Sequence, residues 1–141
     1  MITETSVAYV FPVSGWRLGR CCAEDDGFSI EILDTDGESA RANLTEFRFR
    51  DSDGMEREID GADYREATPI FDRLGTLVEG ALVTKDGQFR VKFRDGAEIV
   101  APRMEGVEAW EVLGPGELFV IAPTGPGEEV SIFGRVVLEG S

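Results

Sequence analysis

The side chains best suited to chemistry in this chain are carboxylates and thiols, because it contains 28 acidic residues, two cysteines and no histidine. The absence of histidine excludes the His-based serine and cysteine triads, the usual zinc sites and the commonest general base near neutral pH. A glycosidase could still use two carboxylates across a cleft. The acids are so numerous that the sequence singles out no such pair. We therefore expect no enzymatic activity, cofactor or metal site.

The two cysteines, Cys21 and Cys22, are adjacent in the sequence. Neighbouring residues of a strand point to opposite faces, so these thiols cannot easily form a disulfide with each other. Without a histidine, a cysteine nucleophile would need activation by an arginine or by a helix N-terminus. The favoured interpretation is two reduced thiols, one of them buried as a small apolar side chain.

Two aspartate-rich segments have part of the composition of a calcium-binding loop. They are Asp34-Thr35-Asp36-Gly37 and Asp51-Ser52-Asp53-Gly54. Their spacing does not fit, because the first ligand position of an EF-hand, counted back from each glycine, falls on Ile32 and Phe49. Turn formation is the better explanation for these aspartates.

Net charge is the strongest compositional signal, since 28 acidic residues against 14 basic ones give a formal charge of −14. This charge disfavours nucleic-acid and anionic-membrane partners and favours a basic protein partner. Solubility alone is the alternative explanation. The imbalance is greatest near the C-terminus, where Arg135 is the one basic residue among seven glutamates: Glu105, Glu108, Glu111, Glu117, Glu128, Glu129 and Glu139.

Trp110 lies within this acidic region, between Glu108 and Glu111. Tryptophans are more often core residues than ligand platforms, and this applies to Trp16 as well. An exposed tryptophan surrounded by acids would instead be a good anchor for a basic protein. The candidate partner-binding residues are therefore Glu108, Trp110, Glu111 and Glu117.

The elements that would position these residues are mostly strands. Asp-Gly pairs, a strong hairpin signal, separate alternating apolar segments; they are Asp26-Gly27, Asp36-Gly37, Asp53-Gly54, Asp86-Gly87 and Asp95-Gly96. The fold class predicted is α+β and mostly β, an antiparallel meander of about eight to ten strands. The strands could form two packed sheets or a half-barrel, with one short helix after the first four. The predicted strands before the helix are 16–22, 28–33, 39–51 and 55–59, and antiparallel strands fill 75–133.

The one segment with helical periodicity is 62–74, where apolar residues recur at three- and four-residue steps. Pro69 interrupts this pattern, so the ordered helix could begin near Thr68. We expect the helix to lie across a sheet and to bury Phe71 and Leu74.

Basic and apolar, mostly aromatic, residues alternate within two predicted strands, over 47–50 of the strand 39–51 and over 89–94 of the strand 88–94, so they should occupy opposite faces. The aromatic side chains, Phe47, Phe49, Phe89 and Phe93, are expected in the core. Arginine interleaved with aromatics could in principle bind RNA, but the net charge argues against it. The basic residues, Arg48, Arg50, Arg90, Lys92 and Arg94, are expected to pair across strands with Glu56, Glu58 and Glu98.

A length of 141 residues with 42% apolar residues suits a single domain over 1–141, in which residues 1–14 are flexible or form an edge strand. No apolar run is long enough to span a bilayer, and no signal peptide is evident. We therefore expect a soluble, cytoplasmic protein.

The sequence resembles a family of small, uncharacterised acidic domains found mainly in actinobacteria. The resemblance runs from Gly15 to Ile121 and rests on four segments: Gly15-Trp16-Arg17-Leu18, Phe28 to Leu33, Phe89 to Ala101 and Glu108-Ala109-Trp110-Glu111-Val112. It implies no catalytic residues. In size, acidity and strand pattern the chain is also similar to the immunity proteins that block toxins exchanged between bacteria.

The leading hypothesis is a non-enzymatic binding protein of the immunity or inhibitor type, which holds a basic protein partner such as a toxin. Two alternatives remain open: a β domain that binds a small molecule or a carbohydrate, and a structural or oligomerising module. A homodimer is compatible with the sequence.

Overall fold

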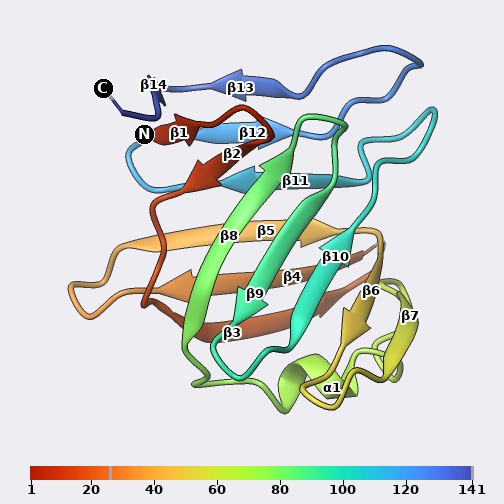
Figure 1. The fold of residues 1–141 in the computed structure, drawn as a ribbon. Helices are drawn as coiled ribbons and strands as arrows, with labels where there is room; N and C mark the ends of the chain where they lie inside the picture. The colour runs from red at the N-terminus through yellow and green to blue at the C-terminus, as the bar shows by residue number, and fades with distance from the viewer. Residues whose placement is uncertain (26, 141) are drawn as a thin grey trace.

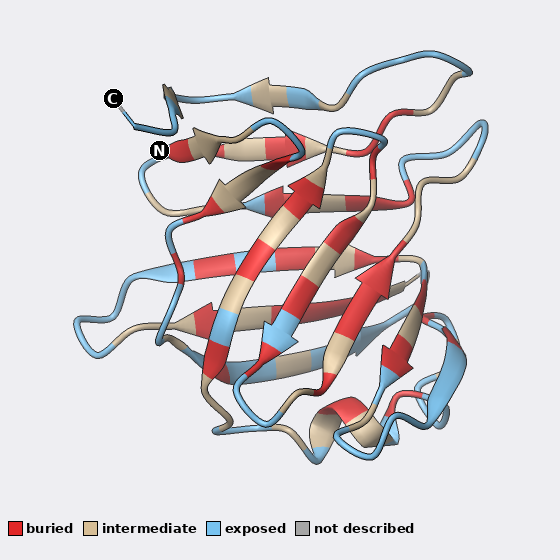
Figure 2. Ribbon diagram, viewed as in Figure 1, coloured by how far each residue is buried: buried red, intermediate tan, exposed pale blue. Residues whose placement is uncertain are grey.

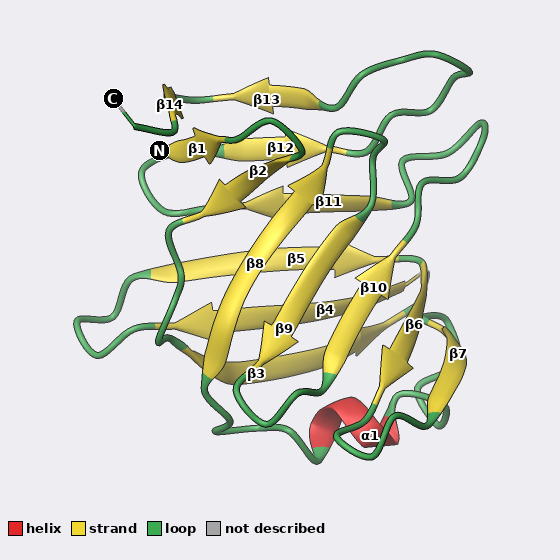
Figure 3. Ribbon diagram, in the orientation of Figure 1, coloured by secondary structure: helices red, strands yellow, loops and turns green. Residues whose placement is uncertain are grey.

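The computed structural model describes residues 1–25 and 27–140 (Figure 1). Within these residues the chain forms an eight-stranded sheet, here called sheet A, and a six-stranded sheet, called sheet B. The strands of sheet A within residues 78–101 cross those of sheet B steeply, and the two sheets pack face to face (Figure 1). The prediction of a mostly β protein with one short helix is confirmed (Figure 3), and of the two arrangements considered, two packed sheets is the one found.

Sheet A contains both ends of the described chain. Its strands, in spatial order, are β14 (Val136–Leu138), β1 (Ile2–Glu4), β2 (Ala8–Phe11), β8 (Val78–Thr84), β9 (Phe89–Phe93), β10 (Glu98–Ala101), β6 (Glu46–Arg50) and β7 (Glu56–Asp60). All neighbours are antiparallel except β1 and β14, which are parallel. Residues 1–14, expected to be flexible or an edge strand, therefore supply two strands inside the sheet.

Sheet B consists of β13 (Ser131–Phe133), β12 (Phe119–Ile121), β11 (Trp110–Leu113), β5 (Ser39–Leu44), β4 (Gly27–Leu33) and β3 (Arg17–Glu24), in that order. The predicted strand 39–51 is in fact two strands, β5 and β6, which belong to different sheets. The physical reason is a change of phase at Thr45: the buried positions are even-numbered up to Leu44 and odd-numbered from Phe47. The residues described contain 14 strands against the eight to ten predicted. The division of 39–51 into two strands and the two N-terminal strands, β1 and β2, account for most of this difference.

Aspartate-glycine turns close the hairpins, as the sequence predicts. Gly37, Gly54, Gly87 and Gly96 all have positive φ, between 87° and 99°. Asp51 Oδ1 accepts hydrogen bonds from the backbone N–H groups of residues 53 and 55, at 2.9 and 3.0 Å. Asp34 does the same in its own turn, so turn formation explains these aspartates. The predicted turn at Asp26 lies outside the described residues.

The core fills the space between the two sheets (Figure 2). The four phenylalanines predicted to be buried on β6 and β9 are each at most 3% exposed. Aromatic rings from the two sheets meet there, with Phe28 stacked on Phe47 at 5.9 Å and Phe89 tilted against Trp110 at 5.8 Å between centroids. These rings join sheet A to sheet B at two separate points.

The helix α1 (Thr68–Phe71) is much shorter than the predicted 62–74 and follows seven strands rather than four. Residues 62–67 form turns instead, and Pro69 lies in the first turn of the helix, where its missing N–H is tolerated. Ile70 is fully buried, and Phe71 packs edge-on against Phe28. Leu74 is 48% exposed, so the expectation that it is buried is wrong.

Candidate functional site

Trp110 is a core residue and not the exposed anchor considered for it. Its side chain is 1% exposed, and its indole N–H donates a hydrogen bond to the carbonyl oxygen of Gly87 at 3.0 Å. A partner protein cannot reach a side chain in this position, so the structure removes Trp110 from the candidate contact residues.

The three candidate glutamates lie at different places along the β11–β12 hairpin. Glu108 is exposed and precedes β11, whereas Glu117 is exposed in the turn at the other end. Glu111 lies between them on the outer face of sheet B, where its carboxylate accepts a hydrogen bond from Asn43 at 2.8 Å. The three side chains therefore border a face of the sheet and do not meet at one point.

The face that they border is apolar. On the outside of sheet B, Leu113 pairs with Phe119 and Phe119 pairs with Phe133, which places three apolar side chains in one row across three strands. Leu113 is 46% and Phe133 58% exposed, and the rings of Phe119 and Phe133 lie 6.2 Å apart. Ile121 adjoins this row. We call these four residues the β11–β13 face.

The residues of this face were not among the predicted site residues, and strand alternation is the one sequence signal that groups them. Val112 and Val120 are buried, so the residues that follow or precede them along each strand must point outward. Large apolar residues at such outward positions are the informative exception in a strand pattern.

Glutamates that are not buried precede, interrupt and follow the strands of the β11–β13 face along the chain. We define the acidic rim as Glu105, Glu108, Glu111, Glu117, Glu129 and Glu139. The loops 102–109 and 122–130 project from the same side in Figure 1 and touch each other, since the N–H of Gly106 donates to the carbonyl of Thr124 at 2.8 Å. Among the described residues, no carboxylate of the acidic rim lies within 4.0 Å of a cationic side chain. No ion pair among these residues therefore offsets the charge of the rim.

Glu128 differs from the rim because the loop uses its carboxylate. Its Oε2 accepts hydrogen bonds from the backbone N–H groups of Thr124 and Gly125, at 3.2 and 3.1 Å. These bonds lower the pKa of the Glu128 carboxyl below its usual value, and the bond from Thr124 has the largest effect. Arg103 donates to the carbonyl oxygens of Gly125 and Glu128. This loop is therefore held in shape near the face.

Cations occupy the outer face of sheet A instead. Arg48 approaches Glu56 at 3.5 Å, and Arg50 approaches Glu98 at 3.4 Å, which confirms the cross-strand pairing predicted for these two arginines. Exposed pairs of this kind contribute little to stability, but they neutralise the surface locally.

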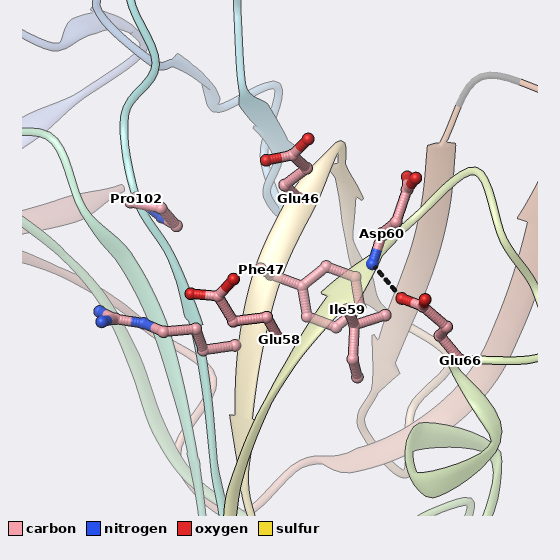
Figure 4. Close-up of a pocket in the computed structure, with 8 residues that line it drawn as sticks. Glu46, Phe47, Glu58, Ile59, Asp60, Glu66 and Pro102 are labelled. Carbon is pink, nitrogen blue, oxygen red and sulfur yellow. Dashed lines mark hydrogen bonds between the residues drawn. The ribbon is translucent and has the colours of Figure 1, made fainter.

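A cleft of about 430 Å³ lies along the outer side of β6 and β7, and Figure 4 shows its lining side chains. Four carboxylates line it, those of Glu46, Glu58, Asp60 and Glu66. They are spread along the cleft, and Glu66 accepts a hydrogen bond from the N–H of Asp60 at 2.8 Å. Its one aromatic residue, Phe47, is buried, so no ring is available to stack on a sugar. In the part of the chain that the structure describes, no group of three or more acids or cysteines is arranged to hold a metal.

A second cleft, of about 530 Å³, is lined by the half-buried Trp16 together with Arg17, Leu33, Asp34 and Thr35. Trp16 offers the partly exposed ring that the first cleft lacks. Two of its polar neighbours already have partners, because Arg17 donates to the carbonyl of Gly75 and Asp34 accepts bonds within its turn.

The two thiols differ in accessibility, and we expect iodoacetamide at about pH 8 to modify Cys22 before Cys21. Cys22 is exposed, whereas Cys21 is half-buried against the core, and burial raises the pKa of its thiol to about 11. Only about one Cys21 thiol in a thousand is then ionised at that pH. Peptide mapping by mass spectrometry after brief treatment measures the difference, with Cys22→Ser as the control. Equal rates at the two cysteines would contradict it.

Comparisons with known proteins identify a family and no individual relative. A family model described as a family of unknown function (DUF6188) matches residues 29–134, which include the whole β11–β13 face. Comparison with curated proteins gives no match, and neither does comparison with solved structures. Among the described residues, no helix has the length and apolar character needed to cross a bilayer.

Proposed function

This chain belongs to the DUF6188 family of unknown function, and from that premise we propose that it is a non-enzymatic binding protein of the immunity or inhibitor type, which holds a basic protein partner on the β11–β13 face. An actinobacterial source, a cytoplasmic location and a toxin as the partner are part of the same proposal. A toxin gene beside the gene for this protein would support it.

The observation that carries this proposal is an exposed apolar row in a part of the chain whose glutamates make no ion pair among the described residues. Leu113 and Phe133 are large apolar side chains that are about half exposed, and they adjoin Phe119 on the same face. Protein interfaces commonly have an apolar, aromatic centre and a polar rim. An anionic rim would steer a basic partner to this face and exclude acidic proteins.

The backbone of Glu117 gives a second reason to place function here. Its φ of 65° lies in the left-handed region, and among the described residues it is the one non-glycine with a positive φ. A glutamate in this conformation costs roughly 1 kcal/mol relative to glycine, and such strain concentrates at functional sites. Glycine would relieve this strain, so a glutamate at the turn is better explained by contact with a partner protein than by a role in folding.

Removing three charges of the acidic rim is expected to weaken retention of a basic partner about tenfold, because peripheral charge pairs each contribute a fraction of a kcal/mol. The variant combines Glu108→Gln, Glu111→Gln and Glu117→Asn; Gln keeps an acceptor for Asn43, and Asn tolerates a positive φ. The measurement is capture from a bacterial lysate at about 50 mM salt and elution at about 500 mM, where screening is strong.

The matched control removes three carboxylates on β6 and β7 of the other sheet that also make no ion pair within the described residues, through Glu46→Gln, Glu58→Gln and Asp60→Asn, and should retain the partner nearly as well as the unaltered protein. Equal losses in both triple variants would show that net charge alone governs binding. Capture of no basic protein at low salt would argue against the proposal as a whole.

The second candidate function, binding of a small molecule or a carbohydrate, is favoured by the cleft beside Trp16. Because Trp110 is buried, acrylamide should quench Trp16 fluorescence selectively. A screen of sugars and metabolites by thermal shift, followed by acrylamide quenching, tests this function. A ligand that both stabilises the protein and shields Trp16 would favour it over the immunity type.

A further inference from the structure

The free edge of sheet B is β13, the last strand in the order of that sheet. The N–H of Gly114 bonds to Leu118 and the N–H of Ala122 bonds to Trp110, so even-numbered residues of the β12 segment face β11. Its odd-numbered residues, Phe119 and Ile121, must then face β13. They pair with Phe133 and Ser131, which leaves the N–H and C=O of Ile132 directed away from the sheet.

Nothing described in the structure covers this edge. Outside β12, no described residue hydrogen-bonds to the backbone of β13. Figure 1 shows β13 as the outermost strand at the top of the molecule. The strand contains no proline and no charged residue, and its register with β12 has no bulge. Proline, charged residues, bulges and short length are usual devices that stop an edge strand from pairing with another chain, and of these devices β13 has only its short length of three residues.

The edges formed by β3 and β7 do carry such devices. Strand β7 has charged residues at four of its five positions. Strand β3 has a register shift between Leu18 and Arg20, and the backbone of Leu18 is already bonded to residues 75 and 76. At the other end of sheet A, β14 is also apolar, but it adjoins no exposed aromatic row. Strand β13 is therefore the open edge that continues the β11–β13 face.

We propose that β13 is the site where an extended, basic segment of the partner protein adds as a seventh strand to sheet B. This inference rests on the proposed function and specifies its mode of binding. Main-chain bonds to Ile132 give affinity in strand addition, and alternate side chains of the segment give specificity. Its apolar side chains would extend the row that ends at Phe133, and basic side chains near its two ends, beyond the residues paired with β13, would approach the acidic rim at Glu117 and Glu129.

The test uses a defined probe, a capped peptide of about eight residues in which lysine and valine alternate. Amide hydrogen exchange followed by NMR should show that saturating peptide slows exchange at Ile132 at least about tenfold. The amides of Ser131 and Phe133, which already face β12, should change much less. A peptide with glutamate in place of lysine should not bind.

Two variants separate strand addition from binding in general. Ile132→Pro removes an N–H that faces outward, so it should keep the pairing with β12 and weaken binding of the lysine peptide about tenfold, the value of one good hydrogen bond. Ile132→Ala loses the same side-chain packing but keeps the N–H, and its affinity should stay close to that of the unaltered protein. Two-dimensional NMR spectra establish that both variants are folded.

The outcomes distinguish this inference from the proposed function. Peptide binding that leaves the Ile132 amide unprotected, and that Ile132→Pro does not weaken, would overturn strand addition while a basic partner on this face remains supported. No binding of the lysine peptide at low salt would count against both. Protection of Ile132 that rises with protein concentration in the absence of peptide would mean that a second copy of this chain occupies the edge, which also overturns the proposal.

Discussion

Replacing Trp110 with alanine is expected to lower the free energy of unfolding by about 3–5 kcal/mol, the range typical of a large aromatic residue removed from a core. The indole is 1% exposed and lies against Phe89, where it fills the space between the two sheets. The substitution also leaves the carbonyl of Gly87 without its donor. Urea denaturation followed by circular dichroism measures the change.

Trp110→Phe is the matched control for this substitution. It keeps an aromatic ring beside Phe89 but loses the hydrogen bond, so a smaller loss of about 1–3 kcal/mol is expected. If Trp110→Ala changed the free energy of unfolding by less than about 1 kcal/mol and abolished partner binding, Trp110 would be a contact residue after all.

Replacing Gly61 with alanine is expected to destabilise the fold by about 2–3 kcal/mol, because the new methyl group would overpack a rigid region. An alanine Cβ at this position would lie 2.6 Å from the carbonyl oxygen of Thr45 and 2.9 Å from that of Leu44. Both neighbours are backbone atoms at the crossover between β5 and β6, and the N–H of Gly61 bonds to Thr45 at 2.7 Å. Neither atom can move without disturbing both sheets.

Gly80→Ala provides the comparison for Gly61→Ala. Gly80 lies in β8, where a Cβ would meet nothing within 4 Å. Alanine there restricts the unfolded chain, so a change between zero and a gain of about 1 kcal/mol is expected. Thermal unfolding of both variants is the measurement. Similar losses at the two positions would show that the close approach at Gly61 is not what requires a glycine.

Local signals were sufficient to predict the hairpins and the core. Asp-Gly turns and alternating phenylalanines predicted the pairing of β8, β9 and β10 because hairpin formation depends on adjacent residues. The division of residues 39–51 between two sheets depends on contacts from distant segments, such as the bond from Thr45 to Ala109. The same limitation explains the helix, where a helical pattern over 62–74 was overridden by turns and by Pro69.

The candidate site was predicted only in part. The sequence alone locates the glutamate-rich region near the C-terminus, since charge is a sum over composition, and a role for it in binding stays a prediction. Whether Trp110 is exposed depends on which face of β11 packs against the core. Glu108 and Glu111 on either side of it suggested an exposed side chain, but Trp110 is buried. Phe119 and Phe133 were treated as ordinary strand residues because alternation places them on one face but does not tell which face of the hairpin is covered.

The parallel pairing of β1 with β14 joins residues 2–4 to residues 136–138. A stretching force applied between residues 1 and 140 would pull these two strands in opposite directions along their lengths. The hydrogen bonds between them would then be loaded together in shear, rather than opened one after another as in a hairpin pulled from its open end. This small pair of strands would act as a mechanical clamp on the rest of sheet A.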